Sequence, residues 1–149
     1  MSKIGILGTG TWGIALGRML ANMGHSVVMW SAIEKEIDDL SSTRVHPNLP
    51  GMTIPQQIQF TKNIEIACEN KEILIFAVPS VFVRSTASKA KAFIPDDQII
   101  VDVGKGIETD TLLTLSEVIK DELQKDGRHQ GIELVALSGP THAEEVALD

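Results

Sequence analysis

The sequence feature that most constrains the fold is a glycine-rich turn near the start of the chain, within KIGILGTGTWGIALGRML (residues 3–20). Residues 3–7 are short and apolar, which is typical of a buried parallel strand. Gly8, Gly10 and Gly13 follow with the spacing G-x-G-x-x-G, and apolar residues then recur every three to four positions, as on one face of a helix. A glycine turn between a strand and a helix predicts that the chain binds a dinucleotide.

Each glycine has its own physical role in such a turn. Gly8 permits the sharp change of direction after the strand, and Gly13 lets the helix pack closely against that strand. Gly10 lets the backbone approach the pyrophosphate, which the free N–H groups and the dipole of the helix N-terminus attract. The alternative interpretation is a glycine turn that sterics alone require, with no ligand.

The rest of the chain alternates between strand-like and helix-like segments. Further strands are expected at residues 26–30, 58–60, 72–78, 98–103 and 132–137, and helices at 34–40, 81–93, 112–125 and within 138–149. Three prolines and a glycine make residues 46–55 a loop. Because strands joined by helices form parallel βαβ units, we expect an α/β fold with a doubly wound, mainly parallel Rossmann-type sheet.

Composition excludes several classes of protein. The 149 residues have the length of one domain, and 13 basic against 20 acidic residues give a net charge of −7 without a basic cluster for nucleic acid. A single cysteine excludes an internal disulfide, and no apolar run approaches the ~20 residues of a membrane span. With no signal peptide recognised, we expect a cytoplasmic protein. The chain stops at Asp149, within a predicted helix, so we expect residues 1–149 to be a fragment.

The end of the second strand departs from the usual dinucleotide-binding pattern. An acidic residue is expected there to bind the ribose hydroxyls. This chain has Trp30, Ser31 and Ala32 instead, and the first acid is Glu34. No arginine stands there to bind a 2′-phosphate, so NAD and NADP both remain open as cofactors, with Ser31 as the candidate binding residue.

Three further loops follow strands, where ligands of open α/β sheets bind. In AVPS (residues 77–80), Pro79 fixes the chain near the cofactor and Phe82 is placed to pack on a flat ring; alternatively, the proline merely starts a helix. In GKGIE (residues 104–108), Lys105 stands between two glycines and is a better ligand candidate than an ordinary surface lysine. SGPTHAEE (residues 138–145) offers Thr141 and a helix N-terminus to an anion, or simply a capped helix start.

Other kinds of site find no support in the residues. Ser138 and His142 lack the G-x-S-x-G context of a nucleophile, and neighbouring residues rarely form a triad. The remaining histidines are scattered without metal-ligand spacing, so no metal is expected.

Five motifs together resemble one family. GTGTWGIALG, NLPG, AVPS, KGIE and SGPTHAEEVA occur in the order and spacing of the bacterial NAD(P)-dependent glycerol-3-phosphate dehydrogenases, over residues 3–148. The resemblance implies reduction of dihydroxyacetone phosphate to sn-glycerol 3-phosphate for glycerophospholipid synthesis. It implies a small phosphate substrate and NAD or NADP as cofactor, and it leaves a homodimer as one option. It also implies a second, all-helical domain, absent from this chain, so the catalytic proton-transferring lysine is expected beyond Asp149.

The same resemblance assigns residues of this chain. Thr11, Trp12 and Ala143 would contact the dinucleotide, Lys105 would contact both cofactor and substrate, and Gly139 and Thr141 would line the substrate site. Two departures, Ala32 in place of a basic residue and the lack of a tyrosine in the NLPG loop, bear on the choice of cofactor. The alternatives are a related hydroxy-acid or ketopantoate-type dehydrogenase, which should lack SGPTHAEEVA, and a non-catalytic dinucleotide-binding module.

Overall fold

A six-stranded, all-parallel sheet forms the centre of this computed structural model, which describes residues 1–139 and 142–148. The strands are β1 (Lys3–Leu7), β2 (Ser26–Trp30), β3 (Gln59–Thr61), β4 (Ile73–Phe76), β5 (Ile99–Asp102) and β6 (Glu133–Ala136). Their order is β3-β2-β1-β4-β5-β6, and every neighbouring pair is parallel. The doubly wound, Rossmann-type sheet expected from the sequence is therefore confirmed.

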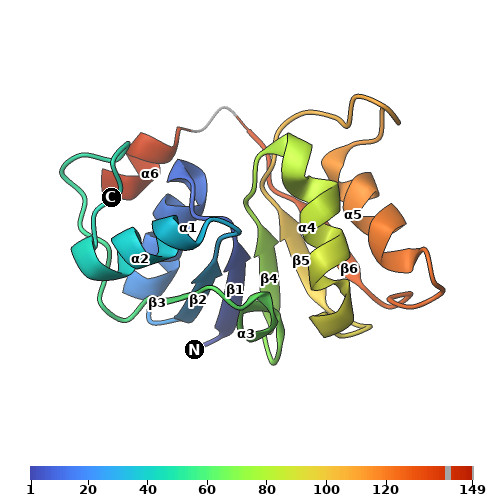
Figure 1. Cartoon of the computed structure of the whole chain (residues 1–149), viewed down its shortest axis with the longest axis horizontal. Coiled ribbons are helices and arrows are strands. Elements are labelled where there is room, and N and C mark those ends of the chain that lie inside the picture. The colour runs from blue at the N-terminus through green and yellow to red at the C-terminus, as the bar shows by residue number, and fades with distance from the viewer. Residues whose placement is uncertain (140–141, 149) are drawn as a thin grey trace.

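Helices cover both faces of the sheet (Figure 1). The helices α1 (Thr11–Asn22), α2 (Glu34–Thr43) and α6 (Ala143–Leu148) lie on one side, and α4 (Val83–Ala90) and α5 (Leu115–Gln124) lie on the other. Each side has its own apolar core, because alternate strand residues point to opposite faces. Ile4 and Ile6 of β1 join the first core, whereas Leu7 joins the second. None of the helices in the described residues is long and apolar enough to cross a membrane.

Two predicted helices start or divide differently in the structure, and the helix predicted at 34–40 extends to Thr43. The segment predicted at 112–125 becomes helical only at Leu115, because Leu112 has a φ of 60° and Thr114 caps the helix in a reciprocal capping box with Glu117. The segment predicted at 81–93 divides into a 3₁₀ turn η1 (Ser80–Phe82), α4, and a second turn η2 (Lys91–Phe93). The helix α4 therefore begins at Val83, after the turn η1, and not at residue 81 as predicted.

The short helix α3 (Ile64–Cys68) was not predicted. Asn63 caps it by accepting a hydrogen bond from the N–H of Glu65 at 3.0 Å. The helix lies against β1 where Gly5 has no side chain, since a Cβ on Gly5 would overlap the carbonyl oxygen of Ala67. Its last residue, Cys68, is buried in the second core, and this burial raises the pKa of the thiol to about 12.

Candidate functional site

The glycine turn joins β1 to α1 at the carboxyl end of the sheet. Gly8 has a φ of 125°, and its N–H donates a hydrogen bond of 2.8 Å to the carbonyl oxygen of Trp30. A Cβ on Gly8 would lie 2.3 Å from the carbonyl oxygen of Ala77, and one on Gly13 would lie 2.7 Å from the carbonyl oxygen of Gly8. These two glycines are therefore required for the turn to fit between β1, β4 and α1.

Gly10 differs from these two glycines, because its surroundings are open. It is the N-cap of α1, and a Cβ placed on it would meet no described atom within 4 Å. It has no side chain to cap the helix, so N–H groups of the first turn are left for an anion. Gly10 also lines three cavities, two of which contain further residues that were predicted to bind cofactor beyond the turn itself. The turn thus has the open approach that a pyrophosphate requires.

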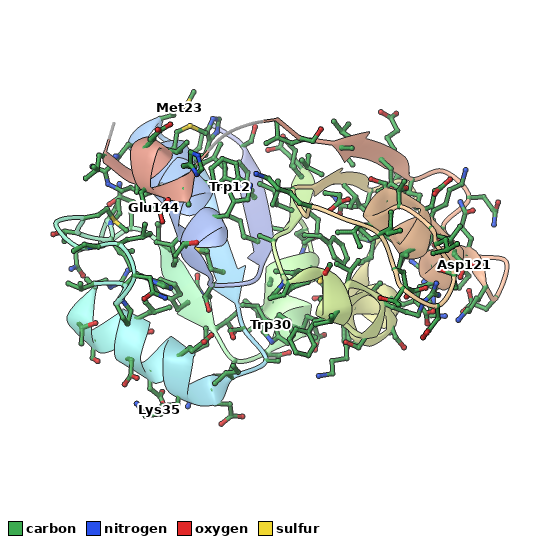
Figure 2. The ribbon with its side chains drawn as sticks, turned by 90° about the horizontal axis from the view of Figure 1, so that it is seen from above. Trp12, Met23, Trp30, Lys35, Asp121 and Glu144 are labelled. Carbon is green, nitrogen blue, oxygen red and sulfur yellow. The ribbon has the colours of Figure 1, made fainter. Side chains whose placement is uncertain are left out.

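The first cavity, of 360 Å³, brings together residues from four parts of the chain. Its described lining consists of Gly10, Thr11 and Trp12; Ala77, Val78 and Pro79; Val103, Gly104 and Lys105; and His142, Ala143 and Glu144. Figure 2 shows Trp12 of α1 and Glu144 of α6 on the same side of the molecule. Six of the predicted site residues meet here, namely Gly10, Thr11, Trp12, Pro79, Lys105 and Ala143.

The predictions made for the end of the chain have different outcomes. Gly139 is exposed after β6 and is not among the described residues that line this cavity. Thr141, the other residue predicted near Lys105, lies outside the described residues. Asp149 also lies outside them, and the described helix α6 ends at Leu148. The expectation of a catalytic lysine beyond Asp149 therefore stays a prediction.

Asp102, the last residue of β5, holds the start of the Lys105 loop. Its carboxylate accepts a hydrogen bond from the N–H of Gly104 at 2.9 Å and another from the hydroxyl of Ser116 at 3.1 Å. Asp102 is buried, and this burial raises the pKa of its carboxyl group. The loop therefore leaves the sheet in a fixed direction, and this direction brings Lys105 to the cavity wall.

The second cavity, of 450 Å³, lies on the β2 side of the turn. Its lining includes Ser31 and Phe82, two residues predicted to bind cofactor, together with Pro79 and Lys89. Pro79 and Gly10 also line the first cavity. A ligand with two halves joined by a diphosphate fits this arrangement, with its diphosphate at Gly10 and one half in each cavity.

Glu36 is a cavity residue that the sequence analysis missed. It lies in the first turn of α2, and its carboxylate Oε2 accepts hydrogen bonds of 2.9 Å from the hydroxyls of both Thr9 and Ser31. The Ser31 hydroxyl in turn accepts the N–H of Ile33 at 3.1 Å. An acid therefore does stand beside the end of β2, contributed by the following helix. The sequence signal for it was the predicted helix at 34–40, which placed acidic residues close after β2.

Comparison with known proteins identifies the family. The family described as NAD-dependent glycerol-3-phosphate dehydrogenase N-terminus matches residues 3–149. Glycerol-3-phosphate dehydrogenase (NAD(P)+) 2 of Lactobacillus delbrueckii subsp. bulgaricus is 67% identical over 149 residues, which is 100% of this chain and 44% of that protein. Glycerol-3-phosphate dehydrogenase (NAD(P)+) of Agathobacter rectalis is 48% identical over 98% of this chain and 42% of its own length. The chain thus spans less than half of these relatives.

Solved structures agree with this family. The crystal structure of glycerol-3-phosphate dehydrogenase from Coxiella burnetii superposes with a TM-score of 0.87 at 28% identity, over 99% of this chain and 43% of that one. A ketopantoate reductase from Ralstonia eutropha has a TM-score of 0.70 at 19% identity over 90% of this chain and 40% of its own, a likeness of fold alone. The chain therefore belongs to the NAD-dependent glycerol-3-phosphate dehydrogenase family, of which it represents the N-terminal, dinucleotide-binding part.

Proposed function

We propose that residues 1–149 are the dinucleotide-binding domain of an oxidoreductase that interconverts dihydroxyacetone phosphate and sn-glycerol 3-phosphate with NAD(P)H. The observation that carries this proposal is the meeting of Lys105 with the glycine turn in one cavity. A cation beside a dinucleotide site suits the reduction of an anionic ketone. The choice of dihydroxyacetone phosphate among ketone substrates rests on the family to which the chain belongs.

The cofactor, when bound, supplies and accepts the hydride. The residues of this chain bind and orient it. The N-terminus of α1 at Gly10 receives the pyrophosphate, and Pro79 lies between the two cavities that take the two halves. Trp12 and Ala143 line one cavity, and Ser31 and Phe82 line the other. A site divided into two cavities in this way fits a dinucleotide better than it fits a single nucleotide.

Lys105, which lines the first cavity beside the glycine turn, is the residue of this chain that we assign to both cofactor and substrate. Its ammonium group attracts the substrate phosphate and stabilises negative charge on the carbonyl oxygen as hydride arrives. We propose that Gly139 and Thr141 complete this side of the substrate site, as the family resemblance implies. Proton transfer to the oxygen is assigned to a lysine beyond Asp149, so residues 1–149 alone should bind cofactor without turning over substrate.

Glu36 supports a preference for NAD over NADP. Two hydrogen bonds hold its carboxylate at the wall of the second cavity, where it disfavours the added negative charge of a 2′-phosphate. Lys89 of α4 lines the same cavity, and its positive charge favours a 2′-phosphate. Both side chains are exposed, but two hydrogen bonds from Thr9 and Ser31 hold the Glu36 carboxylate in place, so the acid should dominate and the preference should be moderate.

We extend the proposal to the pathway and the cellular compartment of the reaction. We assign the activity to glycerophospholipid synthesis in the cytoplasm, which is where a chain with a single buried cysteine keeps that thiol reduced. A homodimer is the assembly to be tested, by sedimentation of the active protein.

A chimera tests the proposed function. In it, this chain replaces the matching 44% of the Lactobacillus delbrueckii relative. The chimera should oxidise NADH in the presence of dihydroxyacetone phosphate and not in the presence of ketopantoate, while the 149-residue chain alone should do neither. A folded chimera that is inactive on dihydroxyacetone phosphate, or that prefers ketopantoate, would contradict the proposal.

A further inference from the structure

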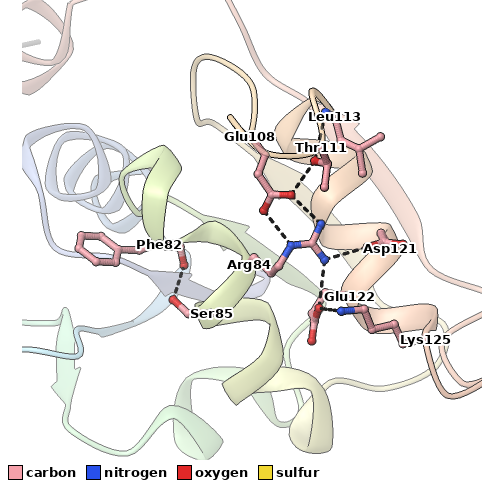
Figure 3. Close-up of polar contacts among 9 residues, drawn as sticks. All are labelled: Phe82, Arg84, Ser85, Glu108, Thr111, Leu113, Asp121, Glu122 and Lys125. Atoms are coloured by element: carbon pink, nitrogen blue, oxygen red, sulfur yellow. Dashed lines mark hydrogen bonds and ion pairs between the residues drawn. The ribbon is translucent and has the colours of Figure 1, made fainter.

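Arg84 of α4 and Glu108 of the loop after β5 form a two-point ion pair (Figure 3). The guanidinium Nε donates to Glu108 Oε2 at 2.7 Å, and Nη2 donates to Glu108 Oε1 at 2.8 Å. Both side chains are largely covered, with exposed fractions of 26% and 21%. Parallel hydrogen bonds of this kind fix the relative orientation of the two groups as well as their distance.

The same guanidinium reaches α5. Its Nη1 donates to Asp121 Oδ2 at 2.7 Å and to Glu122 Oε2 at 3.1 Å, and Lys125 Nζ donates to Glu122 at 2.7 Å. Arg84 therefore connects three parts of the chain, as Figure 3 shows: α4, the loop and α5. An isolated surface ion pair contributes little, but a two-point pair within a network is the kind that holds a geometry.

Glu108 also organises its own loop. The Thr111 hydroxyl donates to its Oε1 at 2.6 Å, its carbonyl oxygen accepts the N–H of Leu112 at 2.8 Å, and its N–H donates to the carbonyl oxygen of Leu113 at 2.9 Å. Together with the Arg84 guanidinium, the Thr111 hydroxyl lowers the pKa of the Glu108 carboxyl group to about 2, so this group is ionised at neutral pH. The far end of the Lys105 loop is thus a closed, hydrogen-bonded turn.

Lys105 lies between two anchors. On one side, the Asp102 carboxylate holds the N–H of Gly104, and on the other side Arg84 holds Glu108. Arg84 follows shortly after Pro79 and Phe82, which line the cavities at the end of β4. The ion pair therefore joins the β4 wall of the site to the β5 wall, which carries Lys105.

The contact between α4 and α5 has a separate basis. Val83 and Ala87 of α4 and Leu115 and Val118 of α5 are buried in the same apolar core. This apolar core holds α4 and α5 together without help from the Arg84 ion pairs. The packing of the two helices therefore does not by itself account for the two-point contact between Arg84 and the loop.

We propose that Arg84 is a positioning residue for Lys105: through Glu108 it holds the 104–108 loop so that the Lys105 ammonium faces the dinucleotide cavity. This inference rests on the proposed function, which gives Lys105 its contact with cofactor and substrate. A lysine at position 84 would keep the charge but lose the two-point geometry, because an ammonium group is a single compact charge.

The test is a double-mutant cycle on the 149-residue chain, with NADH affinity measured by calorimetry. Lys105→Ala should weaken binding about tenfold, and Arg84→Met should weaken it about threefold to tenfold. If Arg84 acts through Lys105, adding Arg84→Met to Lys105→Ala should change the affinity by less than about twofold, because coupled residues are non-additive. Arg84→Lys should recover only part of the lost affinity.

Two further measurements separate positioning from stability. Amide exchange at residues 104–114 should accelerate in Arg84→Met and Glu108→Gln, while exchange in the strands stays unchanged. Lys91→Met is the matched control, since Lys91 of η2 pairs with Asp126 after α5 at 3.9 Å and is not part of the 104–108 loop or its two anchors. That variant should bind NADH normally.

The possible outcomes are distinct. If Lys105→Ala weakens binding but Arg84→Met has no effect, or if the two effects multiply in the double variant, the positioning role is wrong and the proposed function stands. If Lys105→Ala itself leaves NADH affinity unchanged, Lys105 does not contact the cofactor and this inference is wrong, whereas the role of Lys105 toward the substrate is decided separately by kcat/KM for dihydroxyacetone phosphate.

Discussion

The Ser31 hydroxyl donates a hydrogen bond of 2.9 Å to the Glu36 carboxylate, and this contact ties the end of β2 to the first turn of α2. It places an acid at the wall of the second cavity, although residues 30–32 contain none. We therefore propose that a residue of the helix, rather than a residue of the strand, sets the cofactor preference of this chain.

Replacing Glu36 should change the choice of cofactor. In Glu36→Gln, the affinity for NADPH relative to NADH should rise about threefold to tenfold, because one negative charge near a 2′-phosphate is removed. Calorimetric titration with both cofactors measures this ratio. Glu34→Gln is the matched control: Glu34 is also in the first turn of α2, but it pairs with Lys62 at 3.9 Å and does not line the cavity. An unchanged ratio in Glu36→Gln would exclude this role.

Gly10→Val should abolish dinucleotide binding without loss of the fold. A Cβ at Gly10 meets no described atom within 4 Å and the residue is not strained, so the branched side chain should enter only the space that the pyrophosphate needs. Gly13→Val is the contrasting variant, because its Cβ would lie 2.7 Å from the carbonyl oxygen of Gly8. Circular dichroism and calorimetry should show a folded, non-binding Gly10→Val and a destabilised Gly13→Val. A Gly10→Val chain that binds NADH normally would show that the pyrophosphate lies elsewhere.

The Arg84–Glu108 pair predicts a specific dependence of stability on pH. The pKa of Glu108 falls from its ordinary value of 4.5 to about 2 in the folded chain. At pH values above about 4.5, the ion pair therefore makes its full contribution to the free energy of unfolding. As the pH falls from about 4.5 toward 2, the unfolded chain takes up this proton first, and the contribution is lost.

Denaturant unfolding of the unaltered chain and of Glu108→Gln at a series of pH values measures this contribution. The difference in stability between the two should be constant near neutral pH and should shrink in acid. Glu133→Gln, at the exposed start of β6, serves as the control and should give no such trend. A difference that persists undiminished at the lowest pH would contradict the ion pair.

Most of the sheet could be predicted because its signals are local. Apolar runs marked β1, β2 and β4, with a glycine after the first and a proline after the last, and the glycine turn fixed the β1–α1 unit. The helix α3 was not predicted because five residues are too few to show a helical period. The start of α5 was placed too early because apolar Leu112 and Leu113 extend the helical pattern, whereas Thr114 and Glu117 set the actual cap.

From the residues alone, the site was predictable where its residues lie in or close to the loops that follow strands, whereas Trp12 and Ala143 were named from the family resemblance. Pro79 and Lys105 could be named because parallel strands bring their carboxyl ends to one edge. Glu36 was missed because the expected acid was sought at the strand end and not on the next helix. Arg84 was missed because its partner Glu108 lies 24 residues away, and a single sequence does not show which distant charges meet.

We propose that Lys105, carried to the cavity by the loop after β5, acts on the phosphate substrate beside the glycine turn. The rate of NADH oxidation by the chimera, with and without Lys105, measures this role. In the chimera, Lys105→Ala should lower kcat/KM for dihydroxyacetone phosphate by about 100-fold or more, since a charge at the reacting oxygen contributes on that scale. A chimera with Lys105→Ala that retains near-normal kcat/KM would contradict the account.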